Sequence, residues 1–157
     1  MPTTAATEVR ILQAGPGHLS EASDLFDAYR QFYKRPPAPE AVRRYLSARL
    51  AKRDSVLFLG YAPSGSSRPT GFVTLYPSLD SLAMKPLWIL YDLYVAPESR
   101  RHGLARALMN RATQLAGETG ASCLVLETAK DNLQAQALYE QLGYQRDELF
   151  HRYSLPL

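Results

Sequence analysis

The first half of the chain shows apolar residues at two different spacings. Residues 8–14 alternate weakly between apolar and polar, which predicts a first strand that is broken at Gly15. Apolar residues then recur every three or four positions from Leu19 to Tyr33, a spacing that predicts a helix with one buried stripe. Prolines at positions 36, 37 and 39 end that helix, and a second, shorter helix is expected around residues 42–50.

The middle of the chain is rich in strand-forming residues. Residues 55–61 and 71–76 are predicted to pair as an antiparallel hairpin across a polar turn at residues 63–69. Residues 77–86 are expected to form a loop. Residues 87–95 are strongly apolar and aromatic, which is typical of a central strand buried on both faces.

The last third of the chain returns to helical spacing. Residues 104–116 predict an amphipathic helix that ends near Gly117 and Gly120, and residues 121–127 predict a second buried strand. Asp131 and Gln134, three residues apart, are typical of a capping box, which opens a further helix. Residues 144–155 alternate loosely and are expected to form a closing pair of strands. Because there is no repeat and no long linker, this order of elements predicts one α/β domain with a mixed sheet.

Size and composition are those of one globular domain. The chain has 157 residues, of which 46% are hydrophobic and 21% charged. No apolar stretch approaches the roughly 20 residues that span a bilayer. Residues 1–6 resemble a short disordered tail more than a secretory signal, because they lack a basic start and an apolar stretch. The single cysteine, Cys123, cannot form an internal disulfide, so we expect a reducing compartment, the cytoplasm.

The charge pattern narrows the class of partner. The net charge of +3 permits an acidic ligand. Basic residues are scattered except at Arg43-Arg44 and Arg100-Arg101-His102, and no basic stripe is interleaved with aromatic residues, so nucleic acid is not expected. We expect no membrane partner either, and no metal, since His151 has no second ligand at a useful spacing.

The segment over residues 94–105 joins the predicted buried strand to the amphipathic helix through a basic turn. The first turn of a helix leaves backbone N–H groups without partners, and their partial positive charge attracts anions. Gly103 and Ala105 lack bulk, while Arg100 and Arg101 add charge, so the turn predicts a site for a phosphate group. The spacing alone is equally compatible with an ordinary helix start that carries two surface arginines. A Walker P-loop and a three-glycine dinucleotide fingerprint are both absent.

Two motifs resemble the signatures of one family. Arg100-Arg101-His102-Gly103-Leu104-Ala105 resembles the Arg/Gln-x-x-Gly-x-Gly/Ala signature of the Gcn5-related N-acetyltransferase (GNAT) superfamily. Residues 131–144, with Leu138-Tyr139-Glu140 near their end, resemble its second signature. The resemblance covers residues 7–157. It implies one domain with a mixed, mostly antiparallel sheet whose central strands splay apart, flanked by about four helices.

The resemblance implies that acetyl-CoA is the acetyl donor. Pantetheine would lie between the two central strands and pair with backbone of Leu93, Tyr94 and Val95. Asn132 would face the cofactor arm from the following helix. The pyrophosphate would lie on the basic turn and the first turn of the helix, formed by Arg100, Arg101, His102, Gly103, Leu104, Ala105 and Arg106.

The resemblance also suggests catalytic residues. Tyr139 matches the family tyrosine that protonates the departing thiolate, although it also lies on a core face of its helix. Glu127 would be the base, because its spacing to Tyr139 resembles that in bacterial ribosomal-protein alanine acetyltransferases. Asp92 is the competing base, and each carboxylate has a purely structural alternative. A backbone N–H near Tyr94 or Val95 would hold the oxyanion, as a bulge in that strand implies.

The acceptor is expected to bind beside the first two helices. Tyr29, Arg30 and Tyr33, with Asp92, are the candidate substrate contacts, although the two tyrosines also fit a packing role and Arg30 a solvated surface. Residues 148–155 resemble the end of a subgroup with fungal histone and D-amino-acid acetyltransferases, which implies a homodimer. We expect an N-acetyltransferase that acts on a primary amine of a small molecule such as an amino acid or a polyamine. A peptide or protein amine, or a non-catalytic acyl-CoA-binding module, is the alternative.

Overall fold

The centre of the fold is a mixed sheet of five strands within the described residues, 8–63 and 65–157. In this computed structural model, strands β1 (Arg10–Gln13), β2 (Val56–Tyr61), β3 (Gly71–Asp80) and β4 (Lys85–Val95) pair as antiparallel neighbours, and β5 (Leu124–Leu126) pairs with β4 in parallel. The chain divides into two compact units, one that ends at Leu126 and holds the sheet, and one over Glu127–Leu157. The predicted tail at residues 1–6, and Ser64 of the predicted polar turn, lie outside the described residues.

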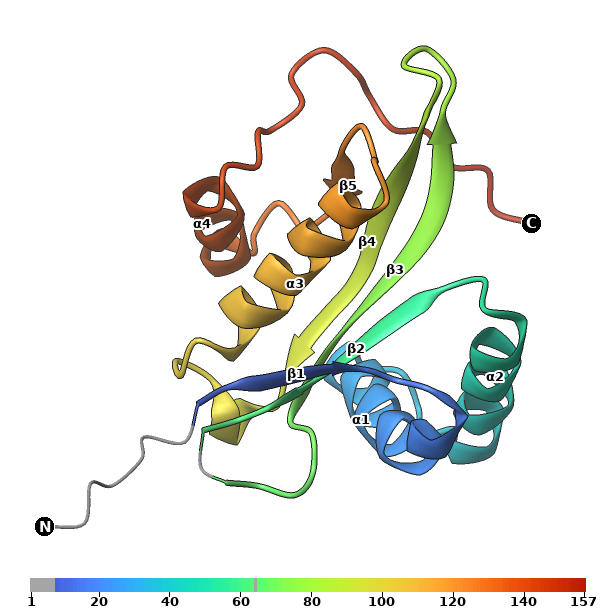
Figure 1. Cartoon of the computed structure of the whole chain (residues 1–157), viewed down its shortest axis with the longest axis vertical. Helices are drawn as coiled ribbons and strands as arrows, with labels where there is room; N and C mark the ends of the chain where they lie inside the picture. The colour runs from blue at the N-terminus through green and yellow to red at the C-terminus, as the bar shows by residue number, and fades with distance from the viewer. Residues whose placement is uncertain (1–7, 64) are drawn as a thin grey trace, which may run out of the picture. The chain divides into compact units, whose positions relative to one another are not determined.

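Helices cover both faces of the sheet (Figure 1). Helices α1 (Leu19–Phe32) and α2 (Pro39–Lys52) lie on one face, and α3 (Leu104–Glu118) lies on the other. Two short 3₁₀ turns precede helices: η1 (Pro16–His18) comes directly before α1, and η2 (Pro97–Ser99) lies between β4 and α3. The prediction of a shorter second helix is wrong, since α1 and α2 each have 14 residues. Helix α2 begins at Pro39 because the first turn of a helix needs no backbone donor from that position.

The alternation of side chains along the strands supplies two core layers. Phe58, Val73 and Leu75 are completely buried on the face that α3 covers. On the opposite face one apolar cluster joins the strands to α1 and α2. It includes Leu57, Leu59, Tyr61, Phe72 and Tyr94 from the strands and Ala22, Leu25, Val42 and Leu46 from the helices.

The start of α3 lies close to the sheet because two paired glycines face it. Gly60 and Gly71 are partners in the register between β2 and β3. A Cβ at Gly60 would lie 2.7 Å from Leu104 Cδ1, and one at Gly71 would lie 3.0 Å from Leu104 Cδ2. Leu104 is the first residue of α3 and is only 1% exposed. This packing therefore determines where α3 begins and where the turn before it lies.

The predicted loop at residues 77–86 is wrong. Strand β3 continues to Asp80, β4 begins at Lys85, and only residues 81–84 form the connection. Strand β2 stops pairing with β3 at Leu75, so β3 continues with β4 as its one neighbour, and Pro77 pairs with Trp88 in the register of this extension. Proline is tolerated there because an edge strand has no ladder partner on its outer side.

Strands β4 and β5 are less buried than their apolar sequences predict. Tyr91 of β4 is 63% exposed, and β5 has three residues with Val125 42% exposed. Strand β5 is the edge of the sheet, so its outer side has no strand to bury it. It pairs with β4 only from Trp88 to Leu90, and β4 continues for five further residues. The expected splay of the central strands is confirmed by this early end of the pairing.

The second unit contains α4 (Leu133–Gln141), and Gly143 ends it with a positive φ of 90°. The cap was predicted one residue too early, because the Asn132 side chain, and not Asp131, accepts the hydrogen bond from Ala135 N–H at 3.2 Å. The predicted closing strands at residues 144–155 are wrong, since this segment contains no strand. The Asp147 carboxylate accepts hydrogen bonds from the backbone of residues 149 and 150, and these donors are then unavailable to a ladder.

Candidate active site

The basic turn between β4 and α3 has the backbone of an anion site. Arg101 has a φ of 65° and Gly103 a φ of 78°, so the chain takes the left-handed region twice within three residues. Gly103 is the N-cap of α3 and has no side chain that could occupy the first-turn donors. A Cβ built on Gly103 would meet nothing within 4 Å, so the space beside it is open. Arg101, His102 and Arg106 are exposed around this opening.

Arg100 supports the turn from within. Its Nε donates a hydrogen bond to the carbonyl of Val95 at 2.9 Å. Its guanidinium lies 5.1 Å from the centre of the Phe32 ring, at the end of α1. The Arg100 side chain therefore joins the end of β4 to α1, whereas the backbone after it remains open to a ligand.

The end of β4 presents backbone polar groups on the side where β5 has stopped. Ala96 N–H donates to Thr70 C=O of the β3 side at 2.7 Å. Because successive residues of a strand aim their polar groups to opposite sides, Val95 and Leu93 direct theirs away from β3. Tyr94 lies between them and packs its ring 5.9 Å from that of Tyr29. This edge is where the sequence predicted that pantetheine would pair.

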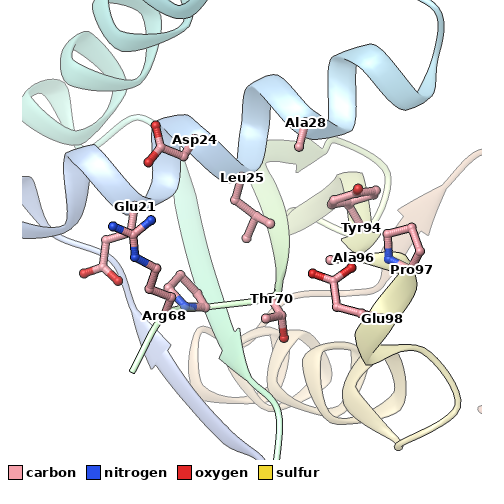
Figure 2. A pocket seen from close by; sticks show the side chains of 11 residues that line it. Glu21, Asp24, Leu25, Ala28, Arg68, Thr70, Tyr94, Ala96, Pro97 and Glu98 are labelled. Carbon is pink, nitrogen blue, oxygen red and sulfur yellow. The ribbon is translucent and has the colours of Figure 1, made fainter. Parts of the chain in front are cut away.

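A cavity of about 320 Å³ lies between α1 and the residues around η2 (Figure 2). Figure 2 shows residues of α1 along one side and the end of β4 with η2 on the other. Of the predicted site residues, Tyr94 alone is among those that line it. The lining residues are Glu21, Asp24, Leu25, Ala28, Arg68, Pro69, Thr70, Tyr94, Ala96, Pro97 and Glu98.

Asp92 is the buried carboxylate of the sheet. It is 6% exposed, on the face that α1 covers. Tyr29 Oη donates a hydrogen bond to Asp92 Oδ1 at 2.7 Å, and Thr74 Oγ1 donates to Asp92 Oδ2. Burial raises the pKa of Asp92, and the two hydrogen bonds act in the opposite direction. Burial raises the pKa of Tyr29 far above its ordinary value, with the charge of Asp92 as the second cause.

A β-bulge places Tyr91 beside Asp92. The register runs from Thr74 opposite Asp92 to Leu75 opposite Leu90, so Tyr91 is the additional residue on β4. A regular strand would point consecutive side chains to opposite faces, and a bulge removes that alternation. The Tyr91 ring accordingly lies 5.5 Å from the ring of Tyr76 on β3. The bulge stands before Asp92, earlier in the strand than the predicted oxyanion donors at Tyr94 or Val95.

Three further tyrosines continue this network, because Tyr76 is near Asp92, Tyr45 contacts Tyr76, and Tyr33 contacts Tyr29. Tyr76 Oη and Tyr45 Oη, from β3 and α2, are 2.7 Å apart, and burial raises the pKa of Tyr76, with the Tyr45 hydrogen bond next. The Tyr33 ring lies 5.1 Å from the Tyr29 ring. Tyr29, Tyr33 and Asp92 were predicted from the sequence as substrate contacts, whereas Thr74, Tyr45 and Tyr91 were not. The excess of tyrosine was visible in the sequence, but only the fold gathers the rings.

Arg30, the predicted contact for a substrate carboxylate, has partners of its own. Its Nη1 lies 3.4 Å from Asp27 Oδ1 and 3.2 Å from the carbonyl oxygen of Pro36. Asp27 also accepts from the backbone N–H of Ala38 at 3.0 Å. Arg30 therefore stabilises the connection between α1 and α2, and its contact with a substrate remains a prediction.

The second unit holds the other predicted residues. Glu127 is 62% exposed and pairs with Arg152. Asn132 caps α4 with its side-chain oxygen. The ring of Tyr139 lies 6.0 Å from that of Tyr144. The proposed roles of these three residues at the cofactor remain predictions.

In the part of the chain that the structure describes, no three His, Cys, Asp or Glu side chains are grouped as metal ligands would be. None of the helices over those residues has the length and apolar character to cross a bilayer.

The chain is similar in sequence and in fold to known proteins. A sequence model of the acetyltransferase (GNAT) family matches residues 22–144. The protein named uncharacterized N-acetyltransferase YhfO of Bacillus subtilis (strain 168) is 36% identical over 147 residues, which cover 94% of this chain and 97% of that protein. The crystal structure of a probable acetyltransferase has a TM-score of 0.88 at 42% identity, with 94% of this chain and 97% of that one covered. A ribosomal-protein-alanine N-acetyltransferase from Brucella melitensis biovar Abortus 2308 shares the fold, with a TM-score of 0.80 at 24% identity over 96% and 100% of the two chains.

Proposed function

Because the chain belongs to the acetyltransferase (GNAT) family, an N-acetyltransferase family that generally takes its acetyl group from acetyl-CoA, we propose that it acetylates the primary amine of a small molecule. The transfer is direct, with amine and acetyl-CoA bound together. One observation carries the proposal: the glycine-capped start of α3 directly follows the edge of β4 that β5 leaves unpaired after Leu90.

The residues of this region fit the donor. The open space beside Gly103 and the donors of the first turn suit the pyrophosphate, with positive charge from Arg101 and Arg106. The outward backbone groups of Leu93 and Val95 suit an extended pantetheine arm, although the Val95 carbonyl already accepts from Arg100. The bound donor supplies a thioester, and the chain has to position it and move protons.

Two proton transfers are needed. The acceptor amine must lose a proton before it attacks, and the departing sulfur must gain one. Tyr139 is the proposed acid for the sulfur. Glu127 and Asp92 are the two candidate bases, of which Asp92 alone is buried. A peptide or protein amine is the alternative acceptor, and a homodimer in the cytoplasm is the form in which we propose that the enzyme works.

The test is a titration followed by an amine screen. Isothermal titration with acetyl-CoA, and with dephospho analogues, should show binding that weakens without the phosphates. Arg101→Ala should weaken that binding, whereas Arg43→Ala, an exposed arginine of α2, should not. Release of free thiol in the presence of an amine panel then reports transfer. A protein that binds no acyl-CoA would contradict the proposed function.

A further inference from the structure

Asp92 is a buried carboxylate whose two hydrogen-bond partners are both neutral. Its two oxygens accept from the hydroxyls of Tyr29 and Thr74, and neither hydroxyl carries a charge. A buried carboxylate is stable when a cation or several donors compensate it. Such a carboxylate is suited to a positively charged ligand.

The groups around Asp92 come from every element that packs on it. Tyr29 belongs to α1 and Tyr33 directly follows that helix. Thr74 and Tyr76 belong to β3, while Tyr91 and Tyr94 stand on β4 itself. Helix α2 contributes Tyr45 and Arg49. Arg49 is already paired with Asp54, with Nη1 and Oδ2 2.9 Å apart.

Aromatic faces at the surface make the approach to this carboxylate favourable for a cation. Tyr33 is 56% exposed, Tyr45 44% and Tyr91 63%. Tyrosine faces attract ammonium groups, and their hydroxyls accept hydrogen bonds from them. A ligand with a carboxylate beside its amine would instead bring a second negative charge close to Asp92.

We propose that Tyr29 and Asp92 form a proton relay for an acceptor that arrives as an ammonium ion among Tyr33, Tyr45, Tyr76 and Tyr91. This inference rests on the proposed acetyl transfer. It names the acceptor class as a cationic alkyl amine with no acid group next to the amine, such as a polyamine or a lysine-like side chain. Tyr29 touches the amine, and Asp92 acts through Tyr29.

The step balances as follows. One ammonium proton passes to Tyr29 Oη while the Tyr29 proton passes to Asp92 Oδ1, which leaves a neutral amine. The amine nitrogen forms a bond to the acetyl carbon, the C–S bond breaks, and the sulfur leaves with the electron pair. The sulfur takes up a proton, the nitrogen loses its surplus proton, and Asp92 releases its own to solvent. The products are the amide, the free thiol and one proton.

The burial of both groups suits this role. Burial raises the pKa of Asp92, which brings the carboxylate closer to an amine in basicity. Burial also raises the pKa of Tyr29, so the phenol stays neutral and passes a proton on without retaining a charge. Geometry supplies the path, because a single hydrogen bond of 2.7 Å joins the two.

The test measures kcat/KM against pH with acetyl-CoA and 1,5-diaminopentane. The wild-type rate should fall about tenfold per pH unit below the pKa of Asp92. In Asp92→Asn this acid limb should be absent from the pH profile, and kcat should be about 100- to 10,000-fold lower, as after removal of a general base. The affinity for acetyl-CoA should be unchanged. Tyr29→Phe should lower kcat by a similar factor.

A second tyrosine–carboxylate pair gives the matched control. Tyr61 Oη donates to Glu21 at 3.4 Å, away from Asp92, so Tyr61→Phe should keep the wild-type profile. Thr74→Val serves if Asp92→Asn fails to fold. Loss of the Thr74 hydrogen bond should move the acid limb to higher pH, because that bond lowers the pKa of Asp92.

The outcomes separate the two proposals. A wild-type protein that binds acetyl-CoA but releases no thiol with any amine overturns the proposed function, and the relay with it. Two results would overturn the relay alone. Asp92→Asn could keep its turnover and its acid limb, or Thr74→Val could have its acid limb at the wild-type pH. Preference for an α-amino acid over the diamine overturns the acceptor class.

Discussion

Gly60→Ala should displace the basic turn between β4 and α3, although Gly60 itself lies on β2. The added Cβ would lie 2.7 Å from Leu104 Cδ1 and 3.3 Å from Leu104 Cγ and Ile11 Cδ1. Carbon atoms prefer separations of about 3.5–4.0 Å, so the closest contact is roughly 1 Å too short. Leu104 is only 1% exposed in the packed core, so its side chain has little space into which it could rotate. The start of α3 must therefore move away from the sheet.

The expected magnitude follows from overpacking. Extra carbons in a packed core cost about 1–3 kcal/mol of the free energy of unfolding. If the shift also removes one charge-assisted hydrogen bond from the turn to a phosphate, at about 1.5–3 kcal/mol, affinity for acetyl-CoA falls roughly 10- to 150-fold. Urea unfolding measures the first quantity and isothermal titration the second.

The matched control is Gly117→Ala, within α3 itself. A Cβ there meets nothing within 4 Å, so alanine should stabilise the protein by about 0.5–1 kcal/mol and leave acetyl-CoA binding unchanged. If Gly60→Ala is as stable as the wild type and binds acetyl-CoA equally well, the packing of Leu104 does not position the turn.

Four further predictions concern single side chains. Asn132→Ala should destabilise α4 by about 1 kcal/mol through loss of its cap, measured by amide hydrogen exchange in that helix. Tyr139→Phe should lower kcat and leave acetyl-CoA affinity nearly intact, whereas unfolding of this variant would support a packing role. Glu127→Gln should alter the pH–rate profile if Glu127 is the base, and an unchanged profile removes it. The raised pKa of Asp92 means that its contribution to stability is present below the unfolded value of about 3.9 and is lost as pH rises through the folded pKa, by about 1.4 kcal/mol per pH unit. Urea unfolding of the wild type and Asp92→Asn between pH 4 and 8 should therefore differ in slope, and parallel curves would contradict the assigned burial of the charge.

The sequence alone predicts the parts of the fold that depend on local spacing. The stripe of apolar residues specifies α3, and Gly120 with a φ of 67° ends that helix as expected. The basic turn before α3 was also predicted, because its chemistry comes from a glycine and the arginines beside it in one short segment. The order of strands and helices as far as α4 was also predicted from these patterns. The early splay of β4 from β5 was expected only through the family resemblance.

Tertiary structure decided what depends on distant partners. Pro77 ends a strand in local terms, yet β4 holds β3 extended past it. The choice of Asn132 over Asp131 as the cap is a matter of which oxygen reaches the Ala135 N–H. The bulge at Tyr91 is the main case, since it arises from the register of two strands and turns two consecutive side chains to one face. The sequence by itself determined that a basic turn with a glycine cap joins a strand to a helix. Only the assembled sheet and helices decided that Asp92 is buried beneath Tyr29, because that burial requires groups 63 residues apart to meet.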